Sequence, residues 1–357
     1  MKRTTVQLPG VTMNSLKEAE NIKMFFHHQH SFIISKIIFT ASELGVFDLL
    51  RESGELLSSA TVAERLKTSL TGMQMLLDAC VGLKVLKVEL KEGKGLYGNT
   101  EFADLFLAKS SSRSQYYSMK FYSGTVYPVM QYLTEAVRDG KPQLLSLYGV
   151  LSKEFYGPLY SSKEGVESFF RFMSEGWSLY GKEVVSAFDL SEFQLIYDLG
   201  GNSGGLAKEL ISVYPNCSVK VFDLPGVLEI SKKYNPFLDE SQISFHEGDF
   251  FKDLIPEADL YILSRILFNW SDEKCIQLLT KVFRACKPGG GVLAMEPIID
   301  DKISGSLPGH LYSIIMLVLC EGKSRKETEL RMLFQTAGFK DIQFKKGNVY
   351  DLILARK

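Results

Sequence analysis

The chain has few cysteines, and they are not arranged for disulfides or metal binding. Five occur in 357 residues, and no two of them form a Cys-x-x-Cys pair. An odd number of scattered cysteines argues against a disulfide framework, and structural zinc sites need closely spaced ligands. We therefore expect no metal site and a cytoplasmic location. The five are Cys80, Cys217, Cys275, Cys286 and Cys320.

The sequence also lacks a long apolar run and an excess of basic charge. Its longest candidate run, 314–320, is far shorter than the roughly 18 residues needed to cross a bilayer, and 1–20 has no apolar core of the signal-peptide kind. Lysine and arginine total 41 against 42 acidic residues, a formal net charge of −1. The short apolar runs lead us to expect no membrane as a partner. Nucleic-acid binding requires a basic surplus, so we expect no nucleic acid as a partner either.

The composition is otherwise that of a globular protein, and its pattern changes near residue 190. Hydrophobic residues make up 45% and charged residues 23%, and this length suits two domains of about 100–200 residues each. Helical patterns dominate before residue 190, and strands and helices alternate after it. We expect a polar tail at 1–20, a winged-helix-like dimerisation domain at 21–115, a helical connector lining a pocket at 116–190, and an α/β Rossmann-like domain at 191–357.

The N-terminal domain is predicted from one long helix and a winged-helix pattern. Residues 25–50 indicate a helix that is apolar on both faces, which fits either the domain interior or an intertwined dimer. Residues 57–100 follow with two short helices, the first opened by a capping box at Thr61 to Glu64, and then a hairpin. The second helix, 71–86, has no basic face, so a structural or dimerisation role is favoured over DNA binding.

The C-terminal domain is predicted as a doubly wound α/β sheet. Short, continuous apolar runs are typical of parallel strands buried on both faces, and helical segments separate them. We expect the last two segments to form antiparallel edge strands. The strands are predicted at 195–197, 219–222, 260–263, 292–295, 339–344 and 349–355, and the helices at 204–214, 272–286 and 325–337.

A glycine-rich run follows the first of these strands and opens a helix. It reads Asp-Leu-Gly-Gly-Asn-Ser-Gly-Gly over 198–205, with Asp198 before Gly200, Gly201 and Gly204. Glycine permits a sharp turn and a close approach of the backbone to a ligand. The spacing differs from the Gly-x-Gly-x-x-Gly of dinucleotide folds. It suits a ligand that carries an amino acid end and a nucleoside.

Further polar residues follow the neighbouring strands. Asp223 ends the second strand, where an acid can accept both ribose hydroxyls, although a helix N-cap is the alternative. Asp249 can accept from an adenine amino group, and Phe250 can stack on the ring. Arg265 follows the strand at 260–263 and can meet a carboxylate or form a surface ion pair. Ligands of open α/β sheets bind at these carboxyl ends, so the set predicts a cofactor site.

Several phrases resemble the vertebrate acetylserotonin O-methyltransferases, which belong to the small-molecule O-methyltransferases that use S-adenosylmethionine. The resemblance runs from about residue 25 to the C-terminus. It implies this cofactor, with S-adenosylhomocysteine as product, a small aromatic acceptor, and a homodimer or a heterodimer with an active relative. The matching phrases lie at 43–50, 187–191, 247–253, 287–291 and 352–357.

The resemblance also shows where this chain departs from the family at the catalytic positions. The family's general base is the His of Leu-His-Asp-Trp, and here Phe268 and Asn269 occupy that phrase. An acid that supports the base is replaced by Ser324, and an Asn that binds substrate by Ile315. Glu296 remains as an acid at the end of a strand. Since Phe268 cannot take a proton, base-assisted O-methyl transfer is not expected.

Other positions complete the predicted site. Asn202 replaces the third glycine of the family's cofactor motif, and Asn tolerates left-handed backbone better than most residues. His310 is the best candidate for a replacement base. Trp177, Tyr180 and Met316 are predicted to line the acceptor pocket, with core packing as the alternative. Surface, interface or packing roles are favoured for the remaining histidines, His27, His28, His30 and His246.

These observations leave three functions open. The first is methyl transfer to a small aromatic acceptor that is already nucleophilic and needs no base. The second is a different reaction on the same fold, and the third is a non-catalytic binding or dimerisation partner. The strands, helix caps and turns still form a consistent pattern, which favours a changed function over decay of the sequence.

Overall fold

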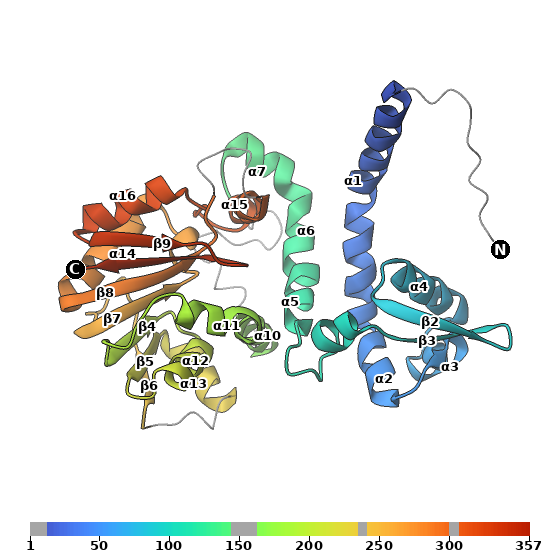
Figure 1. The fold of residues 1–357 in the computed structure, drawn as a ribbon, viewed down its shortest axis with the longest axis horizontal. Helices are drawn as coiled ribbons and strands as arrows, with labels where there is room; N and C mark the ends of the chain where they lie inside the picture. Colours follow the sequence, from blue (N-terminus) through green and yellow to red (C-terminus); the bar gives the residue numbers. More distant parts are fainter. Residues whose placement is uncertain (1–12, 144–162, 235–240, 300–306) are drawn as a thin grey trace. The chain divides into compact units, whose positions relative to one another are not determined.

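A computed structural model describes residues 13–143, 163–234, 241–299 and 307–357 (Figure 1). The chain divides into two compact units, Met1–Ser111 and Ser112–Lys357. Among the described residues, no helix is both long and apolar enough to cross a membrane. The four-part division expected from the sequence stays a prediction.

The first unit combines helices with a small antiparallel sheet in the order β1-β3-β2. The predicted helix over 25–50 is two helices, because Gly45 adopts φ +80° and ends the first of them. Such a left-handed backbone is easy for glycine and costly for most other residues. The elements are α1 (Met13–Glu43), α2 (Val46–Ser53), β1 (Leu57–Ser58), α3 (Ser59–Arg65), α4 (Leu70–Gly82), β2 (Leu86–Lys91), β3 (Lys94–Asn99) and the π-helical turn η1 (Ala103–Leu107).

One local prediction in this unit is wrong, and one of two alternatives for the first helix fails. The cap of α3 is Ser58, whose Oγ accepts the N–H of Thr61 at 3.1 Å, so Thr61 lies inside the helix. For the apolar faces of the first helix, the alternative of the domain interior does not fit, since much of the apolar surface of α1 is exposed in the single chain. An intertwined dimer is the remaining alternative. The exposed residues are Ile22, Met24, Phe25, Phe26, Phe32 and Ile33.

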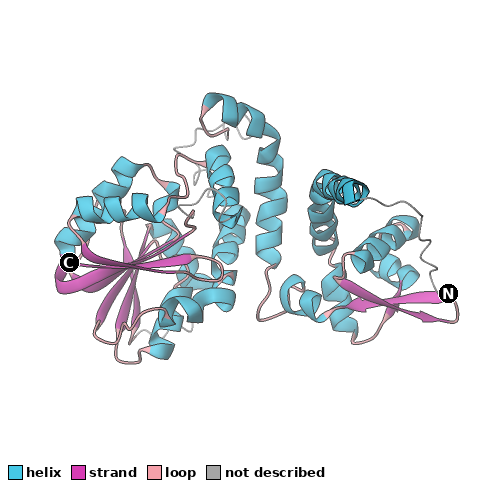
Figure 2. Ribbon diagram, turned by 45° about the horizontal axis from the view of Figure 1, so that its top comes forward, coloured by secondary structure: helices cyan, strands magenta, loops and turns pink. Residues whose placement is uncertain are grey.

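The second unit is built on a sheet in the order β6-β5-β4-β7-β8-β10-β9, with helices on both faces (Figure 2). The first five strands in this order are parallel, and β10 is antiparallel to both β8 and β9. The prediction that both final strands lie at the edge is therefore half wrong, because β10 is internal. The strands are β4 (Leu195–Leu199), β5 (Ser218–Asp223), β6 (Ile243–Glu247), β7 (Ala258–Ser264), β8 (Cys286–Glu296), β9 (Lys340–Lys345) and β10 (Asp351–Arg356).

The helices of this unit lie before its first strand or in the connections between its strands. A run of helical segments spans 116–139, and it includes the π-helical turn η2 (Tyr122–Val126). The remaining helices cover the two faces of the sheet or lie in the connections between its strands. The segments are α5 (Tyr116–Phe121), α6 (Tyr127–Val129), η3 (Met130–Tyr132), α7 (Leu133–Asp139), α10 (Lys163–Glu175), α11 (Trp177–Ser186), α12 (Gly205–Val213), α13 (Pro225–Tyr234), η5 (Leu267–Asn269), α14 (Asp272–Ala285), α15 (Leu307–Leu319) and α16 (Glu327–Ala337).

Strand side chains alternate between two apolar cores. In β4, Tyr197 packs with α14 and α16, whereas its neighbour Ile196 packs with α11 and α12. In β7, Tyr261 likewise packs in the core with α14 and α16, and Leu260 packs in the core with α11 and α12. Successive residues of a strand point to opposite faces, so a strand covered on both sides must be apolar throughout. This covering explains the continuous runs in the sequence, and it leaves the carboxyl ends of the strands as the place for polar groups.

Candidate active site

The glycine-rich run forms a tight loop between β4 and α12. Gly200 and Gly204 adopt φ values of +74° and +71°, and Asn202 adopts +49°. Gly201 is required for a different reason. A Cβ added there would lie 2.6 Å from Oδ2 of Asp198, so the carboxylate could not lie over the loop as it does.

Asn202 is held in its left-handed conformation from both sides of its peptide. Its N–H donates to Oδ2 of Asp223 at 2.9 Å, and its C=O accepts from Oγ of Ser231 at 2.6 Å. Ser231 is fully buried in α13 and lies 29 residues further along the chain. The substitution of a glycine by Asn is therefore accommodated by two contacts, one of them from a serine that sequence reasoning missed.

Asp198 is a buried carboxylate without a partner among the described residues. It is 1% exposed, and neither of its oxygens accepts a hydrogen bond. Burial raises its pKa to about 7, the nearby charge of Asp223 adds to the rise, and Arg265 opposes it. A buried acid of this kind needs a donor or a cation. The ammonium group of an amino acid is both a hydrogen-bond donor and a cation, so the loop fits the methionyl end of S-adenosylmethionine.

Asp223 anchors the glycine loop; it is not the helix N-cap considered from the sequence, because α13 begins at Pro225 and Leu224 stands between them. One oxygen accepts the N–H of Asn202, and the other accepts its own following N–H, from Leu224 at 2.8 Å. Burial raises its pKa to about 6 in spite of these two bonds. A carboxylate has about four lone-pair sites, so two remain for a further ligand. Anchoring the loop and accepting ribose hydroxyls are thus compatible.

The segment after β6 lies beside the glycine loop. The ring of Phe250 comes within 3.8 Å of the place where a Cβ on Gly200 would stand, so Phe250 borders the loop. Its stacking on adenine stays a prediction. The carboxylate of Asp249 turns back on its own segment, where it accepts the N–H of Phe251 at 2.9 Å and pairs with Lys252. Nζ of Lys281 donates to two carbonyls of this segment, those of Phe250 and Asp253, each at 2.7 Å.

Arg265 is buried, so the alternative of a surface ion pair is wrong. It is 8% exposed and has φ +58°. Its Nη2 donates to the carbonyl of Met173 at 3.1 Å, and its guanidinium lies 5.3 Å from the ring centroid of Trp177 and 5.8 Å from that of Tyr180. Trp177 also packs against the start of α12, because a Cβ on Gly205 would meet its ring at 2.4 Å.

The predicted pocket residues pack in two apolar clusters, which a series of ring contacts connects, Tyr180–Tyr350, Tyr350–Tyr312 and Tyr312–Phe268. That they line an acceptor pocket stays a prediction. Trp177 and Tyr180 belong to the core on one face of the sheet, near the glycine loop and Arg265. Met316 and Ile315 lie in a separate apolar cluster around Phe268, which is 9% exposed. The side chains in contact there come from α6, η3, α7, α15 and the short segment after α15. They are Val129, Met130, Leu133, Ala136, Ile315, Met316, Leu317, Val318, Leu319 and Cys320.

The turn that carries Phe268 is held by one acid. Oε1 of Glu296 accepts the N–H groups of Ile266 and Leu267 at 3.2 and 2.8 Å, and Oε2 accepts that of Phe268 at 3.0 Å. Glu296 is 2% exposed, and burial raises its pKa to about 8 although these bonds oppose the rise. The carboxylate is thus committed to the backbone of the turn.

Arg325 completes this turn from the other side. Its Nη1 and Nη2 donate to the carbonyls of Leu267 and Trp270 at 2.9 and 2.7 Å, and its Nε pairs with Asp272 at 2.7 Å. Asn269 turns its amide inward, where Nδ2 donates to the carbonyl of Arg265 at 2.8 Å. Arg325 was not singled out from the sequence, although it directly follows Ser324 in the phrase that was.

The histidine proposed as a replacement base, His310, lies near the start of α15, six residues before Met316. That it acts as a base stays a prediction. His310 Nε2 and Ser324 Oγ are both buried without a partner among the described residues. His246 packs as expected, with Nδ1 3.2 Å from the hydroxyl of Tyr197.

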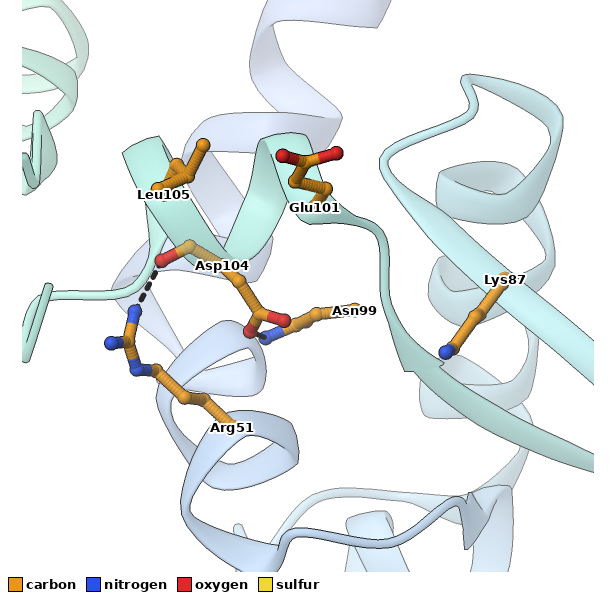
Figure 3. A pocket seen from close by; sticks show the side chains of 6 residues that line it. All are labelled: Arg51, Lys87, Asn99, Glu101, Asp104 and Leu105. Atoms are coloured by element: carbon orange, nitrogen blue, oxygen red, sulfur yellow. Dashed lines mark hydrogen bonds between the residues drawn. The ribbon is translucent and has the colours of Figure 1, made fainter.

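A pocket of about 450 Å³ lies in the first unit, apart from these groups in the chain (Figure 3). Arg51 donates to the carbonyl of Asp104, and Asn99 Nδ2 donates to the Asp104 carboxylate and to the Phe47 carbonyl, each at 2.8 Å. Its polar groups mainly bond to one another and join α2, β3 and η1. The lining residues are Arg51, Lys87, Asn99, Glu101, Asp104 and Leu105.

Comparison with known proteins accounts for this architecture. Residues 130–340 match the O-methyltransferase domain, and residues 26–109 match the O-methyltransferase dimerisation domain. The acetylserotonin O-methyltransferase of Gallus gallus is 49% identical over 97% of this chain and 100% of its own length, and that of Homo sapiens is 46% identical over 95% and 99%.

Solved structures agree. The crystal structure of human N-acetylserotonin methyltransferase in complex with SAM has a TM-score of 0.92 at 44% identity, covering 98% of this chain and 99% of that one. This complex confirms the cofactor expected for the fold. PigF with SAH, at 23% identity and a TM-score of 0.84 over 94% and 99%, shows the same fold. The chain therefore belongs to the acetylserotonin O-methyltransferase family, with the α/β S-adenosylmethionine-dependent methyltransferase fold and an N-terminal dimerisation domain.

Proposed function

We propose that this protein is a homodimeric methyltransferase that binds S-adenosylmethionine and acts on a small aromatic acceptor without a side-chain general base. The observation that carries the proposal is the Phe268 turn. Its backbone is fully held by Glu296 and Arg325, while the side chain in the base position is a phenyl ring among apolar neighbours. The acceptor must therefore bring its own nucleophile, such as a neutral amine or an acidic hydroxyl.

The cofactor half of the proposal rests on the loop after β4. Asp198 offers two unpartnered oxygens to an ammonium group, Asp223 keeps lone pairs for ribose hydroxyls, and Phe250 lies beside the loop for the adenine. When bound, the cofactor supplies an electrophilic methyl group. The protein's own task is then to hold the acceptor in line with that methyl and to exclude water, which the apolar cluster around Phe268 suits.

The acceptor half rests on the turn itself, since none of its residues, 265–270, offers a free acid or base. Glu296 accepts three backbone N–H groups of the turn, and burial raises its pKa to about 8, so near neutral pH it already holds a proton and is not a ready base. A phenol with a pKa near ~10 is a poor nucleophile at neutral pH unless a base helps, and that help is typically worth roughly 10²–10⁴-fold. Methyl transfer to an unactivated phenol should therefore be slower by this factor than in a relative that has a base.

Isothermal titration with S-adenosylmethionine and S-adenosylhomocysteine tests the cofactor half. We expect micromolar binding in the wild type and a loss of more than tenfold in Asp223→Ala, since a charged hydrogen bond contributes roughly 1.5–3 kcal/mol. The matched control is Asp189→Ala, which changes an exposed acid just after α11. It should bind the cofactor as the wild type does. Absence of binding at millimolar cofactor would move the proposal to the second or third function, a different reaction on this fold or a non-catalytic partner.

A further inference from the structure

Glu175, the last residue of α10, joins two helices that are distant in the sequence. Its Oε1 accepts the N–H of Tyr117 and its Oε2 accepts that of Ser118, each at 3.0 Å. These donors belong to the first turn of α5, and Gln115, the residue before α5, makes no side-chain cap to it. The first N–H groups of a helix have no partner within the helix. Glu175 therefore caps α5 from 57 and 58 residues further along the chain.

Two more contacts hold the same junction, which we call the α5–α10 tie. Nε2 of Gln115 donates to the carbonyl of Glu175 at 3.2 Å, so the main chain of α10 is held as well as the side chain. Three residues before Glu175, the ring of Phe172 stacks on that of Phe121, with centroids 4.4 Å apart and an interplanar angle of 7°. The C-terminal end of α10 is thus bound to α5 by polar and apolar contacts together.

The corner between α10 and α11 contacts the candidate cofactor site on both sides of Glu175. Two residues before it, the carbonyl of Met173 accepts Nη2 of Arg265 at 3.1 Å. Two residues after it, the ring of Trp177 fills the space that a Cβ on Gly205 would need, at 2.4 Å, and lies 5.3 Å from the Arg265 guanidinium. Gly205 ends the glycine-rich run and opens α12. The α10–α11 corner therefore bears on both Arg265 and the loop.

Arg265 still has a donor to offer a ligand. Its Nε is buried and has no hydrogen-bond partner among the described residues, although its Nη2 bonds to Met173. A buried donor requires an acceptor, and the carboxylate expected for Arg265 from the sequence is one. The direction of the guanidinium then depends on where the α10–α11 corner places the Met173 carbonyl.

We infer that Glu175 is a positioning residue for the cofactor, because the α5–α10 tie holds the corner that fixes Arg265 and the glycine-rich run against the amino acid end of S-adenosylmethionine. The Glu175 carboxylate bonds to α5, so it acts through the corner and not by contact with the cofactor. The inference rests on the cofactor half of the proposed function. Asp223 and Phe250, proposed for the nucleoside end, follow β5 and β6 instead, so loss of the tie should affect the two ends of the cofactor differently.

The test compares two ligands that differ in the amino acid end. S-adenosylhomocysteine carries it, whereas 5′-methylthioadenosine keeps the nucleoside and the sulfur and has a methyl group in its place. Each is titrated calorimetrically at pH 8, because burial raises the pKa of Glu175 to about 7 and the side chain is then mostly a carboxylate. Glu175→Gln keeps the shape and one acceptor oxygen. It should weaken S-adenosylhomocysteine binding by about 3–10-fold, the effect of one hydrogen bond, and leave the affinity for 5′-methylthioadenosine unchanged.

Glu192→Gln is the matched control for this change. Glu192 is an exposed acid before β4, at the opposite end of that strand from the glycine-rich run, and it pairs with Arg356 at 2.6 Å. The control should bind both ligands as the wild type does. An equal loss for the two ligands in Glu175→Gln would show a general structural effect and overturn the inference. An unchanged affinity for S-adenosylhomocysteine would overturn it too.

Hydrogen exchange tests the same coupling in the wild type, so the test does not depend on the folding of a variant. Coupling between two sites is reciprocal, so S-adenosylhomocysteine must stabilise the α5–α10 tie if the tie favours its binding. The N–H groups of Tyr117 and Ser118 should therefore exchange more slowly with S-adenosylhomocysteine bound than with 5′-methylthioadenosine bound. Equal exchange would overturn the inference.

The outcomes also separate this inference from the proposed function. A wild type that binds neither ligand overturns both. The predicted differences between the ligands, found together with no methyl transfer to any acceptor, would support the role of Glu175 and contradict the proposed methyltransferase activity alone.

Discussion

The carboxylate of Glu296 accepts the backbone N–H of Phe268 at 3.0 Å, so the acid that remains at this site holds the residue that stands in the base position. The same carboxylate accepts two further N–H groups of the turn. An acid with three backbone donors is committed to structure. This relationship explains how the turn keeps its shape although Phe268, in the base position, cannot accept a proton.

Glu296 predicts how stability depends on pH. Its pKa is raised from 4.5 to about 8 in the folded protein, so the folded state keeps a proton that the unfolded state releases. The stability that this proton contributes is fully present below about pH 4.5 and is lost as pH rises through about 8. Glu296→Gln, which does not titrate, should remove this part of the pH dependence.

The measurement is urea denaturation of wild type and Glu296→Gln at several pH values between 5 and 8. Asp198 and Asp223 titrate in the same direction in both proteins, so the difference between the two curves isolates Glu296. As pH rises, the free energy of unfolding of Glu296→Gln should increase relative to that of the wild type. Parallel curves over this range would show that Glu296 does not titrate there.

Arg325 should contribute strongly to stability. It is 2% exposed and donates to two carbonyls of the Phe268 turn and to Asp272. Arg325→Met leaves those carbonyls unpaired, which should cost about 3–5 kcal/mol, whereas Lys323→Met removes an exposed pair with Glu329 and should cost at most about 1 kcal/mol. Chemical denaturation of both variants checks the contrast, and equal losses would contradict it.

Asn202 should behave as a tolerated replacement for glycine. Its backbone is left-handed, and Ala in that conformation costs roughly 1–2 kcal/mol more than glycine. Asn202→Gly should therefore be at least as stable as the wild type, and Asn202→Ala should be less stable and bind S-adenosylmethionine more weakly. Thermal unfolding and calorimetric titration of the pair decide this. Indistinguishable variants would mean that the loop is not held as described.

The sheet could be predicted from the sequence because its signals are local. Runs such as that around Tyr197 are apolar on both sides of the strand, and helices on both faces require this. The position of β10 inside the sheet could not be predicted, since its pairing with β8 joins Asp351 to Glu296 across 55 residues of chain. The break at Gly45 was missed because the apolar pattern continues past it.

The site was only partly predictable for a similar reason. Residues in the glycine-rich run and at strand ends are marked by motif and position, as Asp198 and Asp223 show. Ser231 carries no local signal, because its contact with the glycine loop joins two segments 29 residues apart in the chain. That Trp177 and Met316 pack in different apolar clusters likewise depends on which helix packs on which part of the sheet.

The most direct test of the account is methyl transfer from labelled S-adenosylmethionine to two acceptors, N-acetylserotonin and a neutral aromatic amine. The wild type should label the amine and methylate N-acetylserotonin at least about 100-fold more slowly than the Gallus gallus relative does. Phe268→His combined with Ser324→Glu should restore part of that rate. Methylation of N-acetylserotonin by the wild type at the rate of the relative would contradict the central claim that this site works without a side-chain base.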